Sequence, residues 1–294
     1  MDGLLIIDKP AGITSHDVVD RVRRILGTRR VGHTGTLDPF ATGVMVVLVG
    51  RATRLAQFLD KDEKEYEATI RFGFETDTGD ATGTPKSEAP SPQSVREEHV
   101  KAVLPQFTGE IDQLPPMYSA KKVGGKKLYE SARKGIEVER KSVKVTITTV
   151  ELIAPRPSDN EVRIRVACSA GTYIRTLAED IGRAVGVGAH LTELRRTRSG
   201  RFKLSQAITL ESLGSMDESP SALLPLERAV EHLPAFTLPD DRVEKTRNGM
   251  STRASDQGLD SGQSIRMISA SGELIAIGLY SAEDGAVKPK VVLV

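Results

Sequence analysis

The chain has 294 residues, of which 38% are hydrophobic, and a formal net charge of +1 at pH 7. This length suits one large domain with a small one, or two mid-sized ones, and the absence of long apolar runs excludes a membrane span. The N-terminus lacks a basic region and is expected to be a strand, not a signal peptide. The single cysteine, Cys168, allows no internal disulfide and fits a reducing cytoplasm, and no Cys or His pair has the spacing of a zinc site.

The first elements should be a strand and a helix. Apolar residues from Leu4 to Ile7 predict the strand, which ends at a turn around Pro10. Ser15 is the expected N-cap of a helix to about Leu26, because apolar side chains recur there at helical spacing and a glycine follows.

A loop rich in Gly and Thr then runs from Arg30 to Gly43 and leads into the apolar run 44–49, which predicts a strand buried on both faces. Pro39 disfavours the helical region for Asp38, so this carboxylate has a defined, extended backbone. An Asp-Pro pair in a loop is most often simple turn chemistry. The alternative is a carboxylate held at a strand end as a nucleophile or general base.

The segment from Lys64 to Phe72 alternates apolar and polar side chains, which predicts a half-buried strand with Tyr66 on its inward face. From these residues alone, Tyr66 would be a core tyrosine. Asp80 and the acidic residue three positions earlier lack the ligand spacing of a metal loop and indicate a tight turn. A helix should begin at Ser91-Pro92 and continue to about residue 104.

The segment 113–127 is too irregular and too basic for a core element, and it leads into a short predicted helix at 128–134 that a glycine ends. Two alternating runs, 143–152 and 162–168, should pair as strands. A helix follows, with a buried stripe that includes Leu177 and Ile181. Arg175 falls in its first turn, where the helix dipole disfavours a cation, so it is expected to face a nearby anion. The simpler interpretation is a surface arginine.

Basic residues gather in three places although the net charge is near zero. One cluster lies at 21–30, a second contains Arg195, Arg196, Arg198 and Arg201, and a third runs through 121–144. Such asymmetry fits a phosphate-binding face, although charge runs are more often solvated surfaces. Beyond about Leu233, a short helix and β-like runs at 265–269, 274–280 and 288–294 suggest a small all-β barrel of about sixty residues.

Four ordered motifs resemble the TruB family of tRNA pseudouridine synthases over about residues 1–230. The first is Gly-His-Thr-Gly-Thr-Leu-Asp-Pro-Phe-Ala-Thr-Gly at 32–43, which contains Asp38, and the second is Lys-Glu-Tyr-Glu-Ala at 64–68 with the turn at 76–80. The third is Gly-Thr-Tyr-Ile-Arg-Thr at 171–176, and the fourth spans 188–200. An Asp-Lys-Pro string that contains Lys9 matches the family's opening motif.

The resemblance implies a role for individual residues. Asp38 would be the catalytic carboxylate, Arg175 its cationic partner, and Tyr66 the ring that stacks on the target base and, in one version, a base for a proton step. Leu194 would form an apolar wall, His33 would contact the RNA, Tyr173 would contribute to substrate binding, and Lys9 would support the floor of the site. Whether Asp38 attacks C6 of the base, attacks C1' of the sugar, or acts as a base stays open.

The implied fold is α+β, with a central, mostly antiparallel mixed sheet flanked by helices and loops. A catalytic domain at 1–230 would include an RNA-clamping loop at about 113–142, and a β-barrel resembling the PUA RNA-binding domain would occupy 233–294. The implied reaction converts uridine 55 in the T-loop of tRNA to pseudouridine after base flipping, without cofactor or metal, in a cytoplasmic monomer.

Two rival hypotheses come from other classes. A non-catalytic RNA-binding or tRNA-folding protein would use the same basic clusters. A hydrolase or phosphotransferase with an aspartate nucleophile is disfavoured, because neither a phosphate-cradling Gly-rich motif nor a convincing metal set is present.

Overall fold

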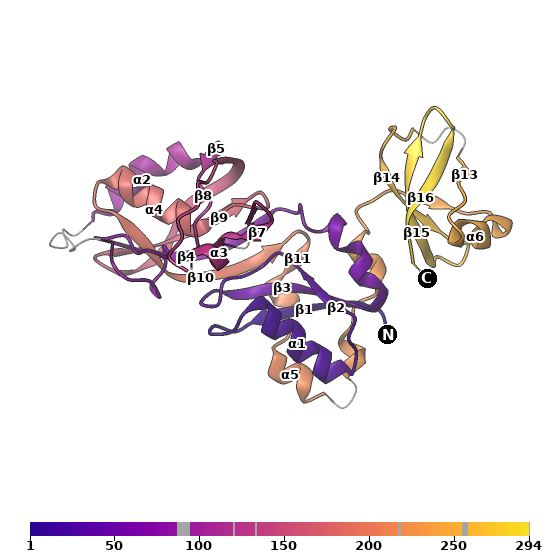
Figure 1. Ribbon diagram of the computed structural model, residues 1–294, viewed down its shortest axis with the longest axis horizontal. Helices are drawn as coiled ribbons and strands as arrows, with labels where there is room; N and C mark the ends of the chain where they lie inside the picture. The colour runs from indigo at the N-terminus through magenta and orange to yellow at the C-terminus, as the bar shows by residue number, and fades with distance from the viewer. Residues whose placement is uncertain (87–94, 120, 133, 217–218, 255–257, 294) are drawn as a thin grey trace.

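A mixed nine-stranded sheet organises the larger part of the chain (Figure 1). The computed structural model describes residues 1–86, 95–119, 121–132, 134–216, 219–254 and 258–293. The strands of this sheet are β1 (Gly3–Lys9), β2 (Val31–Thr34), β3 (Thr42–Val49), β4 (Lys64–Phe72), β5 (Gly109–Gln113), β8 (Val143–Ser158), β9 (Glu161–Cys168), β10 (Ala189–Ser199) and β11 (Phe202–Lys203).

The strand order is β1-β3-β10-β4-β9-β8-β5, with β2 beside β3 and β11 beside β10. The strands β3 and β10 run parallel, and the other pairs run antiparallel. The predicted α+β class with a mostly antiparallel mixed sheet is therefore confirmed. The late strand β10 lies between β3 and β4, so these three strands bring three of the four motifs together.

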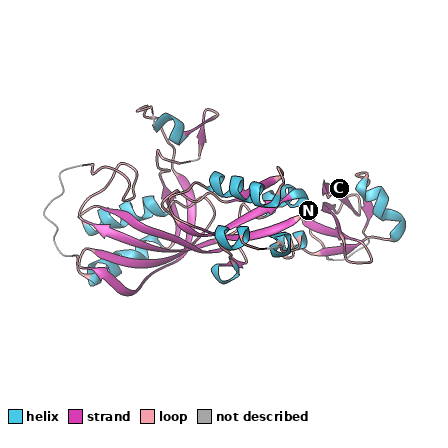
Figure 2. Cartoon of the chain, turned by 90° about the horizontal axis from the view of Figure 1, so that it is seen from below, coloured by secondary structure: helices cyan, strands magenta, loops and turns pink. Residues whose placement is uncertain are grey.

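Helices flank the long strands (Figure 2). They are α1 (Ser15–Leu26), α2 (Glu97–Val103), α3 (Leu128–Ala132), α4 (Ile174–Val185) and α5 (Leu210–Gly214), with 3-10 helices η1 (Gly50–Phe58), η2 (Leu104–Phe107), η3 (Leu204–Gln206), η4 (Ser219–Ala222) and η5 (Leu226–Ala229). Leu177 and Ile181 of α4 are fully buried in one core with β4 and β9, and Val18 and Val22 of α1 are buried in another with β1 and β3. Among the residues described, no helix is long and apolar enough to span a membrane.

The insertion between β5 and β8 projects from the sheet and contains a hairpin and α3 (Figure 2). The hairpin strands are β6 (Lys122–Val123) and β7 (Lys126–Lys127). The irregular basic segment expected from the sequence thus contains two very short strands.

The C-terminal part has its own five-stranded sheet and core. Its elements are β12 (Ala235–Thr237), α6 (Asp240–Arg247), β13 (Thr252–Arg253), β14 (Ser264–Ile268), β15 (Leu274–Ser281) and β16 (Ala286–Val292). The order β12-β14-β15-β16-β13 is open, so within the described residues the sheet is a half-barrel and not a closed barrel. Arg51 and Arg54 of η1 donate hydrogen bonds to the carbonyls of Leu293 and Val292, which tie the last strand to the larger part.

Three local predictions need correction. The cap of α1 is Thr14, whose side chain accepts from the amide of Asp17 in a capping box, and not Ser15. Residues 31–34 of the expected loop form β2. The helix α2 begins only at Glu97, after two non-helical residues, and the expected start at Ser91-Pro92 lies outside the described residues.

Candidate active site

The loop between β2 and β3 holds Asp38 on a backbone that two buried side chains fix. The hydroxyl of Ser15 accepts from the Leu37 amide at 2.9 Å and donates to the Leu37 carbonyl at 3.0 Å. The ammonium of Lys9, fully buried, donates to the carbonyls of Pro39 at 3.2 Å and Ala41 at 2.7 Å. The residues on both sides of Asp38 are therefore anchored, and the carboxylate has a defined direction.

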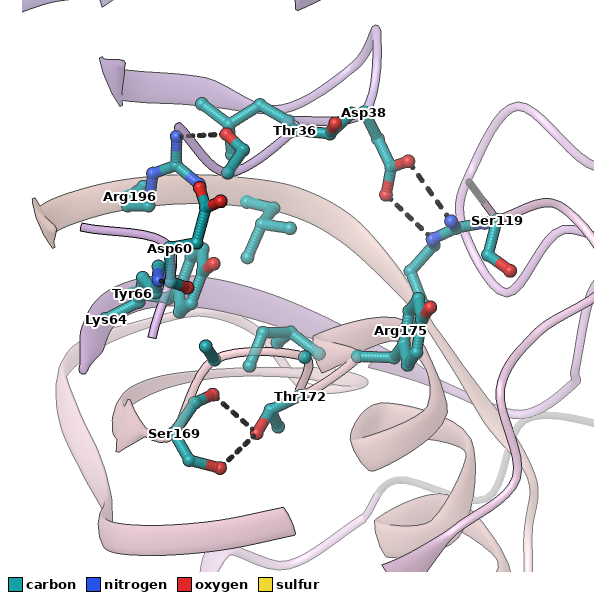
Figure 3. Close-up of a pocket in the computed structure, with 17 residues that line it drawn as sticks. Thr36, Asp38, Asp60, Lys64, Tyr66, Ser119, Ser169, Thr172, Arg175 and Arg196 are labelled. Carbon is teal, nitrogen blue, oxygen red and sulfur yellow. Dashed lines mark hydrogen bonds and ion pairs between the residues drawn. The ribbon is translucent and has the colours of Figure 1, made fainter. Parts of the chain in front are cut away.

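Asp38 forms a two-point ion pair with Arg175, in the first turn of α4 (Figure 3). The Nε and Nη2 atoms of Arg175 lie 2.9 Å from Oδ2 and 3.1 Å from Oδ1 of Asp38. The same guanidinium donates to the carbonyls of Thr78 and Tyr118, each at 2.7 Å, and lies 3.7 Å from a carboxylate oxygen of Asp80. The unfavourable dipole position of Arg175 is thus offset by two carboxylates and two carbonyls.

The electrostatic surroundings of Asp38 act in opposite directions. Burial raises the pKa of the Asp38 carboxyl above its usual range, and Asp80 raises it further, whereas Arg175 and Lys9 lower it. The balance lies on the raised side. A carboxylate that is poorly solvated and held in one orientation is suited to act as a nucleophile or base.

A cavity of about 230 Å³ opens beside this ion pair. Asp38, Tyr66, Tyr173, Arg175 and Leu194 all line it, so the structure brings together five residues selected from the sequence. They come from the Asp38 loop, β4, the start of α4, and β10. A flat aromatic side chain, an apolar side chain and a fixed carboxylate that line one cavity are suited to bind a planar ring beside the carboxylate.

Tyr66 lies on the inward face of β4, as predicted, and is 9% exposed. Burial raises the pKa of the Tyr66 hydroxyl, and the neighbouring Arg196 guanidinium opposes the increase. The phenol therefore stays protonated at neutral pH and presents a hydroxyl to the cavity.

His33 and Lys9 do not line this cavity. His33 lies on β2, where burial lowers its pKa and its Nδ1 atom is buried without a hydrogen-bond partner in the structure. Lys9 lies beneath the loop that carries Asp38, where burial lowers the pKa of its ammonium to about 8. Its contact with the loop backbone is the geometry expected of a floor residue.

The insertion is tied to the first turn of α4. The side chain of Gln113, fully buried, accepts from the Tyr173 amide at 2.7 Å and donates to the Tyr173 carbonyl at 3.0 Å. The Tyr118 carbonyl accepts from Arg175. The insertion is thus connected directly to the Asp38–Arg175 ion pair.

Sequence reasoning missed the positioning side chains. The sequence predicts Ser15 as a helix cap, and Gln113 carries no signal because a lone glutamine between a strand and a loop is common. Asp80, expected in a turn, does accept from the Thr82 amide at 3.0 Å and also faces Arg175. The part of the chain that the structure describes contains no group of three or more His, Cys, Asp or Glu that could hold a metal ion.

The second basic cluster is not the free phosphate-binding face that its sequence suggested. Arg195 pairs with Asp8 at 2.7 Å, and Arg198 and Arg201 also pair with carboxylates. Arg196 is only 1% exposed. Side chains alternate between the two faces of the sheet along β10, and its pairing with β4 is irregular at two places. These arginines therefore point to different sides of the sheet.

Comparisons with known proteins agree with this architecture. Residues 23–174 match the family model of the N-terminal domain of TruB family pseudouridylate synthases, and residues 175–231 match that of the tRNA pseudouridylate synthase B C-terminal domain. A tRNA pseudouridine synthase B from Solibacter usitatus is 45% identical over 95% of each chain, and one from Bacillus subtilis is 41% identical over 100% of this chain and 98% of the relative.

Solved structures of lower sequence identity share the fold of this chain. The crystal structure of a Cbf5-Nop10-Gar1 complex matches with a TM-score of 0.75 and 31% identity, over 99% of this chain and 85% of that chain. A structure of an H/ACA RNP bound to a substrate RNA containing 2'-deoxyuridine matches with a TM-score of 0.74 and 30% identity, over the same shares. The chain therefore belongs to the TruB family of pseudouridylate synthases.

Proposed function

We propose that this protein isomerises uridine 55 in the T-loop of tRNA to pseudouridine, with Asp38 as the catalytic carboxylate. The observation that carries the proposal is the two-point Asp38–Arg175 ion pair at the edge of a cavity that Tyr66 and Leu194 also line. Relatives named tRNA pseudouridine synthase B, similar over nearly the whole chain, support tRNA as the substrate.

The reaction needs a flipped-out base, because a carboxylate at the edge of a cavity cannot reach a nucleotide that is stacked in the T-loop. Tyr66 stacks on the uracil and Leu194 closes the other side of the cavity, while Tyr173 contacts the substrate from the start of α4. The C1'–N1 bond breaks, the uracil turns, and C5 joins C1'. C5 loses its proton and N1 gains one, so the reaction balances without oxidant, reductant or cofactor.

Arg175 orients both oxygens of Asp38. Its positive charge favours the ionised carboxylate and so opposes the increase in pKa that burial causes. Lys9 supports the loop from below. His33, on a strand outside the cavity, would contact the RNA around the space that the flipped nucleotide leaves. These contacts are suited to a substrate far larger than one base.

The rest of the chain would bind the remainder of the tRNA. Residues 1–230 form the catalytic domain in this proposal, the basic insertion at 113–142 clamps the T-stem-loop, and residues 233–294 act as a PUA-like RNA-binding domain. The half-barrel at 235–292 and the Cbf5 structural matches support the last assignment. We further infer that the protein acts as a monomer in the cytoplasm.

A tritium-release assay tests the function. The wild-type protein is incubated in chelator with tRNA transcript labelled at uridine C5, and with the same transcript carrying cytidine at position 55. Release of about one label per tRNA from position 55 is expected, and it should disappear from the second transcript. Tight tRNA binding without any release would overturn the enzymatic proposal in favour of a non-catalytic RNA-binding protein. Equal release from both transcripts would refute uridine 55 as the modified nucleotide.

A further inference from the structure

Arg196 is a charged side chain that the reaction described above does not use. It lies near the end of β10 and, together with Lys9, is one of the two largest fully buried charged side chains of the described residues. It also lines the cavity, on the side away from the Asp38–Arg175 ion pair (Figure 3). At 1% exposure it cannot act as a surface ligand for phosphates.

The guanidinium of Arg196 connects the two ends of the loop that carries Asp38. Its Nη2 donates to the carbonyl of Gly35 at 3.0 Å, where the loop leaves β2. Its Nε donates to the carbonyl of Val44 at 2.6 Å, where the chain has entered β3. One planar group therefore fixes the distance between the two ends of the seven-residue loop 35–41.

The backbone of Arg196 fixes the same loop a second time. Arg196 lies opposite Gly43 in the parallel pairing of β10 with β3. Gly43 has a φ of +102°, and a Cβ atom added there would lie 2.2 Å from the Arg196 carbonyl oxygen. The close approach of the two strands at this point requires a glycine.

The charge of Arg196 is unusual for its burial. Within the part of the chain that the structure describes, its guanidinium pairs with no carboxylate and instead faces the two backbone carbonyls and the hydroxyl of Tyr66. An apolar side chain of similar volume would avoid the cost of desolvating a cation. A guanidinium at this position is explained if its planar fork is needed to bind the carbonyls of Gly35 and Val44 at the same time.

We propose that Arg196 is a positioning residue for catalysis: by joining the carbonyls of Gly35 and Val44, it holds the Asp38 loop in register with Arg175. Lysine presents its donors from one nitrogen and lacks the planar fork that places Nε and Nη2 at the two carbonyls, and methionine provides no donor. A displacement of the carboxylate by about 1 Å is sufficient to reduce the rate by about 10²-fold. Arg196 contacts no part of the substrate in this scheme.

The test compares Arg196→Lys and Arg196→Met with wild type in single-turnover tritium release, with enzyme in excess and saturating. The proposal rests on the proposed function, and wild type tests that function separately in the same experiment. Arg163→Lys is the matched control, because Arg163 lies in the same sheet on β9, is about one third exposed, and pairs with Glu67 at 3.2 Å. Its rate should stay within twofold of wild type.

Both Arg196 variants are expected to lose about 30- to 100-fold in the single-turnover rate constant while the tRNA dissociation constant changes less than threefold. Arg196→Met removes the buried charge and so tests the same point if the lysine variant does not fold. A rate within threefold of wild type in a folded variant would refute the proposal. So would weaker tRNA binding with an unchanged saturated rate, which would make Arg196 an RNA ligand.

Discussion

Substituting Arg175 by lysine separates the charge of this side chain from its geometry. Two charges about 4 Å apart attract by about 4 kcal/mol at an effective dielectric constant of 20, and lysine retains most of this attraction. It loses the fork that contacts both oxygens of Asp38, at 2.9 and 3.1 Å. One charge-assisted hydrogen bond is worth about 1.5–3 kcal/mol, which corresponds to a rate reduced about 10- to 150-fold.

Single-turnover tritium release with saturating enzyme measures this change, and filter binding of tRNA should show an affinity within threefold of wild type. Arg183→Lys is a matched control on the same helix. Arg183 also contacts both oxygens of a carboxylate, that of Glu75, at 2.6 and 2.8 Å, but its side chain is 54% exposed. Exposed pairs contribute little, so its rate should be unchanged. An Arg175→Lys enzyme as fast as wild type would show that the orientation of Asp38 is unimportant.

Three further predictions concern the same loop. Asp38→Asn should raise the melting temperature at pH 7.5, because burial raises the pKa of the Asp38 carboxyl and the wild-type protein loses stability as the pH rises through that raised pKa. Calorimetry should show that the difference in melting temperature between variant and wild type vanishes toward pH 4. An equal difference at both pH values would contradict the account. Urea denaturation of wild type and Lys9→Met at pH 7 and 9.5 should show that wild type gains stability relative to the variant as the pH rises. The reason is that Lys9 keeps its proton in the unfolded chain but has released it in the folded protein, where its pKa is about 8. An equal difference in the free energy of unfolding at both pH values would refute the lowered pKa. Gly43→Ala should lower the free energy of unfolding, measured with denaturant, by at least about 3 kcal/mol, because the added Cβ would collide with the Arg196 carbonyl. Gly12→Ala is the control: Gly12 has a φ of +85° but open space around it, so the loss should be about 1 kcal/mol. Equal losses would contradict the claim that the close approach requires a glycine.

The sequence predicted elements best where a single periodicity decides them. The strand from Lys64 to Phe72 has the predicted bounds, because its apolar residues alternate against a single core. The helix end at Gly27 was also predicted, since a left-handed C-cap favours glycine. The Asp38–Arg175 contact followed from family motifs together with the unfavourable dipole position of Arg175.

The remaining features depend on contacts between distant segments. Thr14 and Ser15 are both good caps, and the choice is made by Leu37, whose backbone binds the Ser15 hydroxyl from 22 residues away. Neighbouring Arg195 and Arg196 look equivalent in the sequence, yet one pairs with Asp8 near the surface and the other is buried beneath the loop. No local pattern specifies the pairing irregularities of β10 that separate their roles.

The central claim is that the carboxylate of Asp38 performs the chemistry. The most direct measurement is single-turnover tritium release by Asp38→Asn, which keeps the shape and one acceptor oxygen but removes the charge that Arg175 binds. The account predicts no detectable release above background and tRNA affinity within threefold of wild type. Release by Asp38→Asn at a rate near that of wild type would contradict the account and place the catalytic group elsewhere in the cavity.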